Sequence, residues 1–333
     1  MAFKQAILIT LRHDGWINFN QWRMALMQQR LFFDSSKTIY SEVTAIFDFI
    51  WPTAAAMWNL RWQVKGLVGE SPDISQEVLL GRFVVGSDIR GANLRRSCID
   101  NTWGQQKEQF AKIMLAEFCA LYEAWYSALN EELLGLFKSK KKKIYEYPEI
   151  LKELASMPNS TPLEAVIYLA LTGNKKCDLK ALPHMISCYR FFKELRNGYI
   201  HNGGVAGQRQ LDAYLLYNSL SATDLGVSEV PEHPNIKLGH KYQLTLRGVV
   251  GFGDVLLRLI VTLDAEFARK SLAEHVFVKK WKVNVSQRYI LPANEQDADR
   301  MIRKLILKMH LKAPKTALAL KGLLKEHDLV GAF

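Results

Sequence analysis

Apolar residues recur every three or four positions along much of this chain, the spacing of amphipathic helices. In residues 107–137 one such stripe comprises Phe110, Met114, Phe118, Leu121, Trp125 and Leu136. The same spacing predicts further helices over residues 21–33, 52–68, 73–85, 182–201 and 244–272. The sequence therefore predicts a mainly α protein whose longest helices form a bundle.

Capping and breaking residues mark several helix ends. Pro52 is expected to be the first residue of its helix, because proline is favoured there. Residues 148–170 are expected to hold one or two shorter helices, with Thr161-Pro162-Leu163-Glu164 as a start. Asn202-Gly203-Gly204 predicts a helix end, because glycine accepts the left-handed backbone found there.

The pattern changes after Ala273. Residues 276–278 form a short apolar run and residues 281–285 alternate apolar and polar positions, which together predict a short strand pair. Residues 299–312 and 314–326 then predict two basic helices. The chain thus divides into an N-terminal helical segment (1–90), a helical domain (91–273) and a small basic C-terminal segment (274–333).

Charge adds a possible class of partner. The chain has 333 residues, a formal net charge of +11 and a pI of about 9.4. Such an excess favours a polyanion, with nucleic acid ahead of an anionic membrane, although a basic protein without such a partner fits equally well. The lysine run Lys140, Lys141, Lys142 and Lys143 is either a solvated loop or a phosphate-binding one.

The remaining composition favours a reduced, cytoplasmic protein without a metal or another cofactor. The four cysteines form no CxxC pair, and Cys119 and Cys188 fall at apolar helical positions that predict core residues. The N-terminus lacks the apolar core and cleavage site of a secretory signal. No stretch of 18 apolar residues predicts a membrane span, since residues 244–263 contain Arg247, Asp254 and Arg258.

Tryptophans are concentrated near the N-terminus, at Trp16, Trp22, Trp51, Trp58 and Trp62. Core packing is their usual role. If they are exposed, they are also suited to stacking on nucleic-acid bases.

One short run carries recognisable chemistry: Arg196-Asn197-Gly198-Tyr199-Ile200-His201. An arginine, a polar residue, three spacers and a histidine, at the end of a helix, resemble the motif of the HEPN superfamily. The resemblance covers about residues 90–273, where three long predicted helices match the expected bundle. It implies a HEPN-type endoribonuclease that acts as a homodimer or within a larger complex, such as a toxin or an antiviral-defence effector. A regulatory partner protein or ligand is then also expected.

The residue types suit metal-independent RNA cleavage, in which the 2′-hydroxyl of RNA attacks the neighbouring phosphorus. His201 is the natural proton carrier near neutral pH. Arg196 offers a permanent planar cation to the developing phosphate charge. Asn197 is placed to hold His201 or a phosphate oxygen, and Arg190 is a further candidate for RNA binding.

The predicted helix separates the two main groups. At about 100° per residue, Arg196 and His201 lie roughly 140° apart. Either the helix ends or distorts at Gly198, or the arginine side chain reaches round, or two subunits combine their residues. The resemblance implies the third arrangement.

Two alternatives involve no cleavage. In the first, Arg196 pairs with Glu117 or Glu123 and His201 caps the helix end, in a non-catalytic module that binds nucleic acid or protein. A HEPN domain that binds a nucleotide without cutting RNA is the other.

Overall fold

The structure is a computed structural model that describes residues 31–133, 149–285 and 287–332, and it confirms a mainly α fold. In its first part lie α3 (Asp34–Glu70), α4 (Gln76–Phe83), η1 (Arg96–Asp100) and α5 (Trp103–Glu132). Then come α6 (Glu149–Ser156), α7 (Thr161–Leu163), η2 (Glu164–Tyr168), α8 (Leu169–Thr172), α9 (Leu182–Asn202), α10 (Gln208–Tyr217), α11 (Ala222–Leu225) and α12 (Leu246–Ala268). The last part holds α13 (Ala273–Val285), β1 (Tyr289–Leu291), α14 (Glu295–Lys308), η3 (Leu318–Leu320), α15 (Lys321–Glu326) and β2 (Val330–Ala332).

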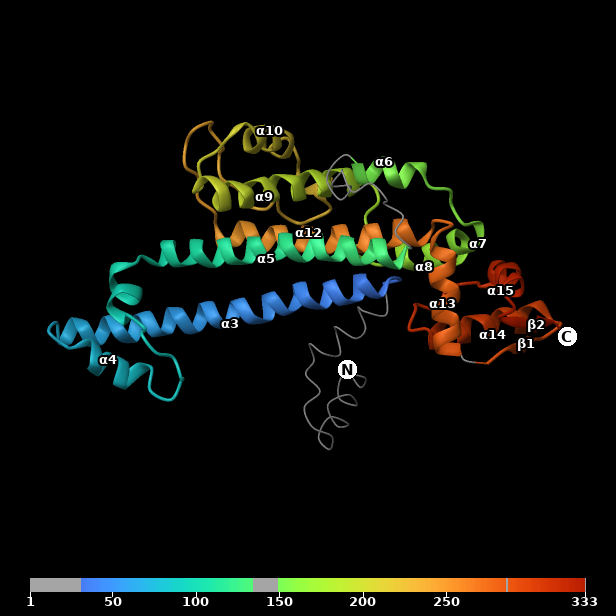
Figure 1. Cartoon of the computed structure of the whole chain (residues 1–333), viewed down its shortest axis with the longest axis horizontal. Helices are drawn as coiled ribbons and strands as arrows, with labels where there is room; N and C mark the ends of the chain where they lie inside the picture. The colour runs from blue at the N-terminus through green and yellow to red at the C-terminus, as the bar shows by residue number, and fades with distance from the viewer. Residues whose placement is uncertain (1–30, 134–148, 286, 333) are drawn as a thin grey trace, which may run out of the picture.

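Four long helices make up the body of the molecule (Figure 1). Helix α12 packs against α3, α5 and α9, and α10 packs on α9. Helix α4 lies at one end of this body, whereas α13, α14 and α15 lie at the other. The expected bundle in 91–273 supplies α5, α9 and α12, and the fourth long helix, α3, comes from the N-terminal segment.

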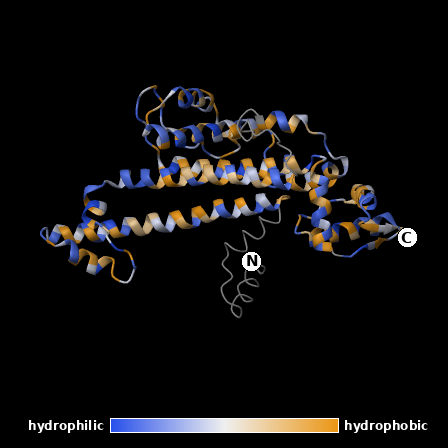
Figure 2. Ribbon diagram, viewed as in Figure 1, coloured by the Kyte–Doolittle hydropathy of each residue, from blue (hydrophilic) through white to orange (hydrophobic). Residues whose placement is uncertain are grey.

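The centre of the body is aromatic. The ring of Phe252 on α12 stacks on Phe192 at 4.6 Å between centroids and contacts Phe118 at 6.2 Å. Gly253 allows the close approach, because a Cβ there would lie 2.5 Å from Phe47 and 2.8 Å from Phe118. Most of α12 is apolar and buried accordingly (Figure 2).

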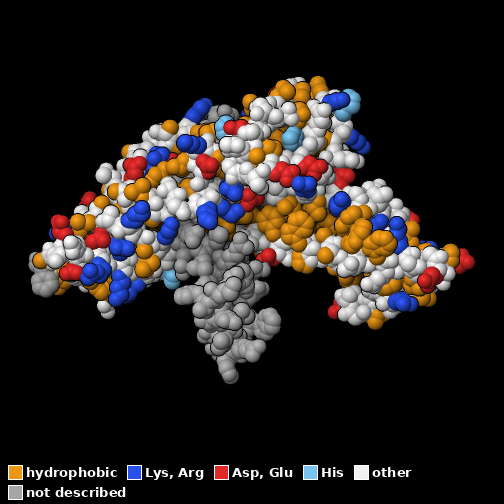
Figure 3. All heavy atoms as spheres, turned by 180° about the vertical axis from the view of Figure 1, so that it is seen from behind, with side chains coloured by type: hydrophobic (Ala, Val, Ile, Leu, Met, Phe, Trp, Pro, Cys, Tyr) orange, Lys and Arg blue, Asp and Glu red, His pale blue; other side chains and the backbone are white. Residues whose placement is uncertain are grey.

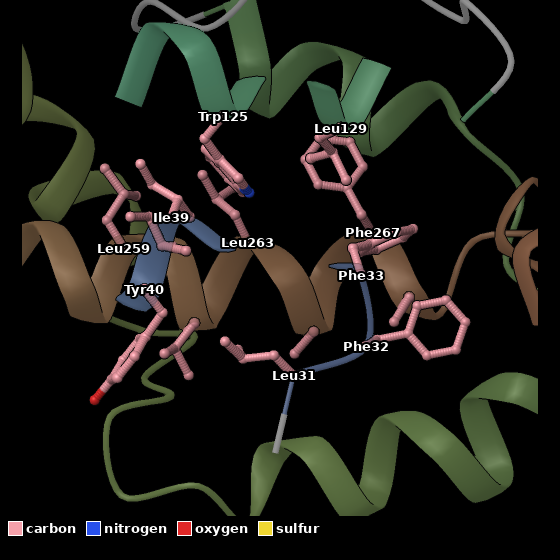
Figure 4. Packing of buried hydrophobic residues seen from close by; sticks show 14 of the residues in the cluster. Leu31, Phe32, Phe33, Ile39, Tyr40, Trp125, Leu129, Leu259, Leu263 and Phe267 are labelled. Carbon is pink, nitrogen blue, oxygen red and sulfur yellow. The ribbon is translucent and has the colours of Figure 1, made fainter. Parts of the chain in front are cut away.

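An extended segment just before α3 is anchored on α12. The backbone N–H groups of Phe32 and Phe33 donate to the buried carboxylate of Asp264 at 2.7 and 3.0 Å. Their rings pack near Phe267 (Figure 4). Burial raises the pKa of Asp264 to about 6. One buried cluster includes Leu31, Phe118 and Trp281, so it has members in all three segments of the expected division.

Pro52 does not begin a helix, contrary to prediction. It lies inside α3, which begins at Asp34. Proline removes the hydrogen bond to the carbonyl four residues earlier, which in a buried helix costs about 3 kcal/mol. Here Asp48 and Pro52 are both exposed, so water can hydrate that carbonyl.

The predicted strand pair was placed wrongly. Residues 276–278 and 281–285 belong to helix α13, whose buried residues Ala273, Phe277, Trp281 and Val285 recur every four positions. A run of five alternating residues is too short to distinguish the two periods. The strand pair lies nearby instead, as β1 and β2 in parallel register, with Tyr289 opposite Val330.

Most other helices are present with shifted ends. Helix α5 begins four residues earlier than predicted, where Thr102 and Gln105 form a capping box. Helix α14 likewise begins early, since the Asn294 side chain accepts from the N–H of Gln296. Helices α4 and α15 are shorter than predicted. Of the helix predicted over residues 21–33, residues 21–30 lie outside the described residues, and residues 31–33 are not helical. No described helix is long and apolar enough to cross a membrane.

Candidate functional site

Helix α9 carries the motif and remains regular through it. The helix runs without a break to Asn202, and Gly203 (φ 59°) ends it in the predicted left-handed conformation. Gly198 is needed for a close contact rather than a bend. The Tyr242 hydroxyl donates to the Leu195 carbonyl at 2.7 Å, and a Cβ on Gly198 would lie 2.1 Å from that hydroxyl.

The continuous helix keeps Arg196 and His201 on different faces, about 140° apart. Arg196 is half-buried beside α5, whereas His201 is exposed. An end or distortion of the helix at Gly198 is therefore excluded as the way to bring them together. Two of the three arrangements are left: the arginine side chain reaches round the helix, or a second subunit supplies one of the two residues.

Among the described residues, Arg196 has no carboxylate partner. Its Nη1 donates to Asn197 Oδ1 at 3.1 Å, and its Nε is buried without a hydrogen bond. Glu123, one of the partners considered from the sequence, pairs with Lys193 instead at 3.0 Å. Glu117, the other, is exposed on α5 and makes no ion pair within the described chain. Asn197 thus orients Arg196 and forms no hydrogen bond with His201 in the described structure.

Arg196 lines a cavity of about 320 Å³ between α5 and α9. Lys112 of α5 lies across this cavity and pairs with Glu108 at 2.9 Å. Its ammonium also lies 4.7 Å from the centre of the Tyr199 ring, whose hydroxyl contacts Glu108 and the Tyr242 carbonyl. The apolar walls include Leu115 and Leu244. The cavity therefore combines two cations, an aromatic ring and apolar surface.

Sequence reasoning did not identify Lys112 or Tyr242 as parts of this site. Lys112 lies more than eighty residues before the motif, and only the packing of α5 on α9 brings them together. The one local signal was the spacing of Glu108 and Lys112, which suits an ion pair on one helix face.

The other predicted RNA contacts are less informative. Arg190 is half-buried on α9 and makes no hydrogen bond or ion pair within the described residues, including none with Glu194. Glu194 instead accepts a hydrogen bond from Gln210 through its carbonyl at 2.8 Å. Lys140, Lys141, Lys142 and Lys143 lie outside the described residues.

A second cavity, of about 640 Å³, adjoins the first at Leu244. It is lined by residues of three helices and the chain before α12, including Trp51, Lys107 and Arg247. Trp51 belongs to an exposed stripe on α3 that we call the tryptophan face: Trp51, Trp58 and Trp62, exposed by 50%, 39% and 61%. The side of the molecule seen in Figure 3 also carries a broad hydrophobic patch toward the α4 end. The exposure that stacking on bases would require is thus present.

The two cysteines predicted as core residues are buried. Cys119 and Cys188 are fully buried, which confirms them as core residues, and burial raises the pKa of Cys119 to about 12. The part of the chain that the structure describes also contains no group of three His, Cys, Asp or Glu side chains placed to hold a metal ion.

Comparison with known proteins found no matching family model, no matching curated protein and no matching solved structure.

Proposed function

We propose that this protein is a metal-independent endoribonuclease of the HEPN type, with Arg196, Asn197 and His201 at its active site. The observation that carries the proposal is the state of Arg196. A partly buried guanidinium that has no carboxylate partner in the described part of the chain, held by an asparagine at the edge of a cavity, is suited to receive an anion. A phosphate of RNA is such an anion.

The reaction follows from the chemistry of the two side chains. The 2′-oxygen forms a bond to phosphorus while the bond from phosphorus to the 5′-oxygen breaks. A histidine accepts the 2′-hydroxyl proton, and an imidazolium returns a proton to the departing 5′-oxygen. Arg196 stabilises the charge that accumulates on the phosphoryl oxygens. The products are a 2′,3′-cyclic phosphate and a free 5′-hydroxyl.

A second copy of the chain is part of the proposal. On one regular helix Arg196 and His201 diverge by about 140°, so a phosphate at Arg196 is served more readily by His201 of another subunit. His201 and Ile200 are exposed at the helix end, where such a copy can reach them.

RNA is proposed to extend from the motif toward the tryptophan face. The two cavities share Leu244, and their linings include Arg196, Lys112, Lys107 and Trp51. Cations along such a surface neutralise phosphates, and exposed indole rings stack on unpaired bases. Arg190 and the lysine run 140–143 are proposed as further contacts.

In the cell we propose a toxin or antiviral-defence role in the cytoplasm, which the motif resemblance implies. An active ribonuclease there requires restraint, so a regulatory protein or ligand belongs to the proposal.

Cleavage of labelled RNA by the full-length protein in EDTA tests the activity. We expect cyclic-phosphate ends in wild type and a loss of about 100- to 10,000-fold in His201→Ala and Arg196→Ala. His327→Ala, which changes an exposed histidine in the C-terminal part, is the matched control and should cut normally. Mixing the two inactive variants should restore part of the activity if subunits share a site. Metal-dependent cleavage that leaves 5′-phosphates would contradict the mechanism.

The tryptophan face supports one competing function, a non-catalytic module that binds nucleic acid or another protein. The same assay separates the two: RNA bound but uncut by wild type, with equal affinity in His201→Ala, would favour the binding module.

A further inference from the structure

A third cavity lies at the opposite end of α9 from the motif. Its volume is about 540 Å³, within the range of sites for small molecules. Helix α6, the following loop, the start of α9 and the end of α12 surround it (Figure 1). Five of its lining residues are apolar (Leu151, Leu154, Ala155, Met157 and Leu182) and four are polar (Asn159, Glu266, Arg269 and Lys270).

Lys270 stands out in the polar wall. It is only 5% exposed, yet its ammonium contacts neutral oxygens alone: the Met157 carbonyl at 3.2 Å and Asn159 Oδ1 at 2.8 Å. No carboxylate of the described chain lies within ion-pair distance of it. An ammonium has three donors, so one remains without an acceptor among the described residues. A buried cation in this condition is costly unless an anion completes it.

The nearby carboxylates are engaged elsewhere. Glu266 accepts from the Tyr168 hydroxyl at 2.9 Å with one oxygen and from Arg269 at 2.6 Å with the other. Glu164 accepts from Arg269 at 3.4 Å and from the amide of Asn159 at 3.1 Å. These two acids therefore compensate the charge of Arg269, although its Nε has no acceptor among the described residues. Lys270 is left as the cation of the cavity lining without a carboxylate partner in the described chain.

We propose that this cavity binds a small aliphatic carboxylate, such as a medium-chain fatty acid. The single free donor of Lys270 matches one carboxylate oxygen, and the leucine wall takes the hydrocarbon. A phosphate head fits less well, because it carries more negative charge beside Glu266. The site is separate from the motif, and the proposal is independent of ribonuclease activity.

Calorimetric titration of the full-length protein with decanoate, below its micelle concentration, tests the site. We expect saturable binding of one decanoate per chain and weaker binding of decanol and decyl phosphate, each by about tenfold or more. Lys270→Met should weaken decanoate binding by about tenfold or more, since it keeps the stem and removes the charge. Lys152→Met, which removes an exposed charge of α6 outside the cavity, is the control and should bind as wild type does.

Because Lys270 also holds the 157–159 loop, a second variant keeps the test independent of folding. Ala155→Phe fills the cavity from the apolar side without altering any charge, and it should abolish decanoate binding. The proposal fails if wild type shows no saturable binding, if decanol or decyl phosphate binds as tightly as decanoate, or if Ala155→Phe binds normally.

Discussion

The guanidinium of Arg196 is held in the fold at a cost, because its Nε is buried and no described residue accepts a hydrogen bond from it. An unmade buried hydrogen bond costs about 1–3 kcal/mol. We expect Arg196→Leu to leave the free energy of unfolding unchanged or to raise it by about 1 kcal/mol, while cleavage is lost. Urea denaturation measures the first effect and the RNA assay the second.

Lys193 lies one turn earlier on α9 and, unlike Arg196, has a carboxylate partner among the described residues. It is buried and paired with Glu123, which is about a third exposed. Lys193→Met leaves that carboxylate unpaired and should lower the free energy of unfolding by about 1–3 kcal/mol, less than for a fully buried pair. If Arg196→Leu destabilised the protein as much as Lys193→Met, the arginine would have a structural role and the argument for an anion there would fall.

His201 should be nearly neutral for folding. It is exposed on the last turn of α9, and surface substitutions of this kind usually change stability by about 0.5 kcal/mol or less. Thermal unfolding of His201→Ala should therefore resemble wild type while cleavage is lost. A markedly lower melting temperature would favour the alternative in which the histidine only caps the helix.

At this scale, sequence reasoning located the motif, the divergence of Arg196 from His201, and the buried Cys119 and Cys188. It did not locate the surroundings of Arg196. Helical spacing relates residues of one helix, whereas Lys112 and Tyr242 reach the motif from other parts of the chain. The packing of α5 and of the segment before α12 was needed to place them.

The contact between α9 and the segment before α12 depends on Gly198. A methyl group at 2.1 Å from the Tyr242 hydroxyl forces that side chain out and breaks its hydrogen bond to Leu195. We expect Gly198→Ala to lower the free energy of unfolding by about 1–3 kcal/mol. Tyr242→Phe removes the clashing oxygen, so the double variant should lose less stability than the two single variants together. Strict additivity in urea denaturation would contradict this account.

Asp264 makes the attachment of residues 31–33 to α12 depend on pH. Burial raises its pKa in the folded protein to about 6, from 3.8 in the unfolded chain. Between these values the folded state binds more protons, so stability falls as pH rises from 4 to 6. The free energy of unfolding of wild type, relative to Asp264→Asn, should fall by about 2–3 kcal/mol across this window.

Asp254 on the same helix serves as a control, because its stability contribution should change with pH in the opposite direction. Burial alone would raise its pKa, but Lys176 and Arg258 lower it overall. Wild type relative to Asp254→Asn should therefore lose stability as pH falls below 4. Parallel profiles for the two comparisons would show that Asp264 does not titrate as described.

The elements were largely predictable, and the failures have local causes. Long apolar stripes predict α5, α9 and α12, because helical spacing repeated over more than twenty residues leaves little ambiguity between helix and strand. Helix α3 was missed as a unit because Pro52 signals a helix start, and only the exposure of that turn shows why it is tolerated. Helix α13 was taken for strands because its short alternating run fits both periods.

At the scale of the whole molecule, the net charge of +11 predicts RNA binding that weakens with salt. Each neutralised phosphate releases a counterion, and the slope of log affinity against log salt is about −0.7 per phosphate for a single strand. We expect a slope that corresponds to several phosphates, measured by fluorescence anisotropy with an unpaired RNA and the His201→Ala variant, which leaves the RNA intact. A flat response would remove the electrostatic case for RNA as the partner.

Stacking on the tryptophan face can be separated from these charge contacts in the same titrations. Trp58 and Trp62 contact each other edge to face at 5.7 Å, and Trp58 also packs on Trp103, so the rings are held in place while they remain exposed. A base stacked on an aromatic ring contributes about 1–3 kcal/mol. Trp58→Ala and Trp62→Ala should each weaken binding of unpaired RNA by about that amount, yet leave the salt slope unchanged, because no phosphate contact is lost.

Phe49→Ala is the matched control for the tryptophan variants. Phe49 is 66% exposed on α3, but it lies nine residues from Trp58 and therefore points about 180° away from it. If the Phe49 variant lost as much affinity as the tryptophan variants, or if all three bound like the parent protein, RNA would not follow the path from the motif to this face.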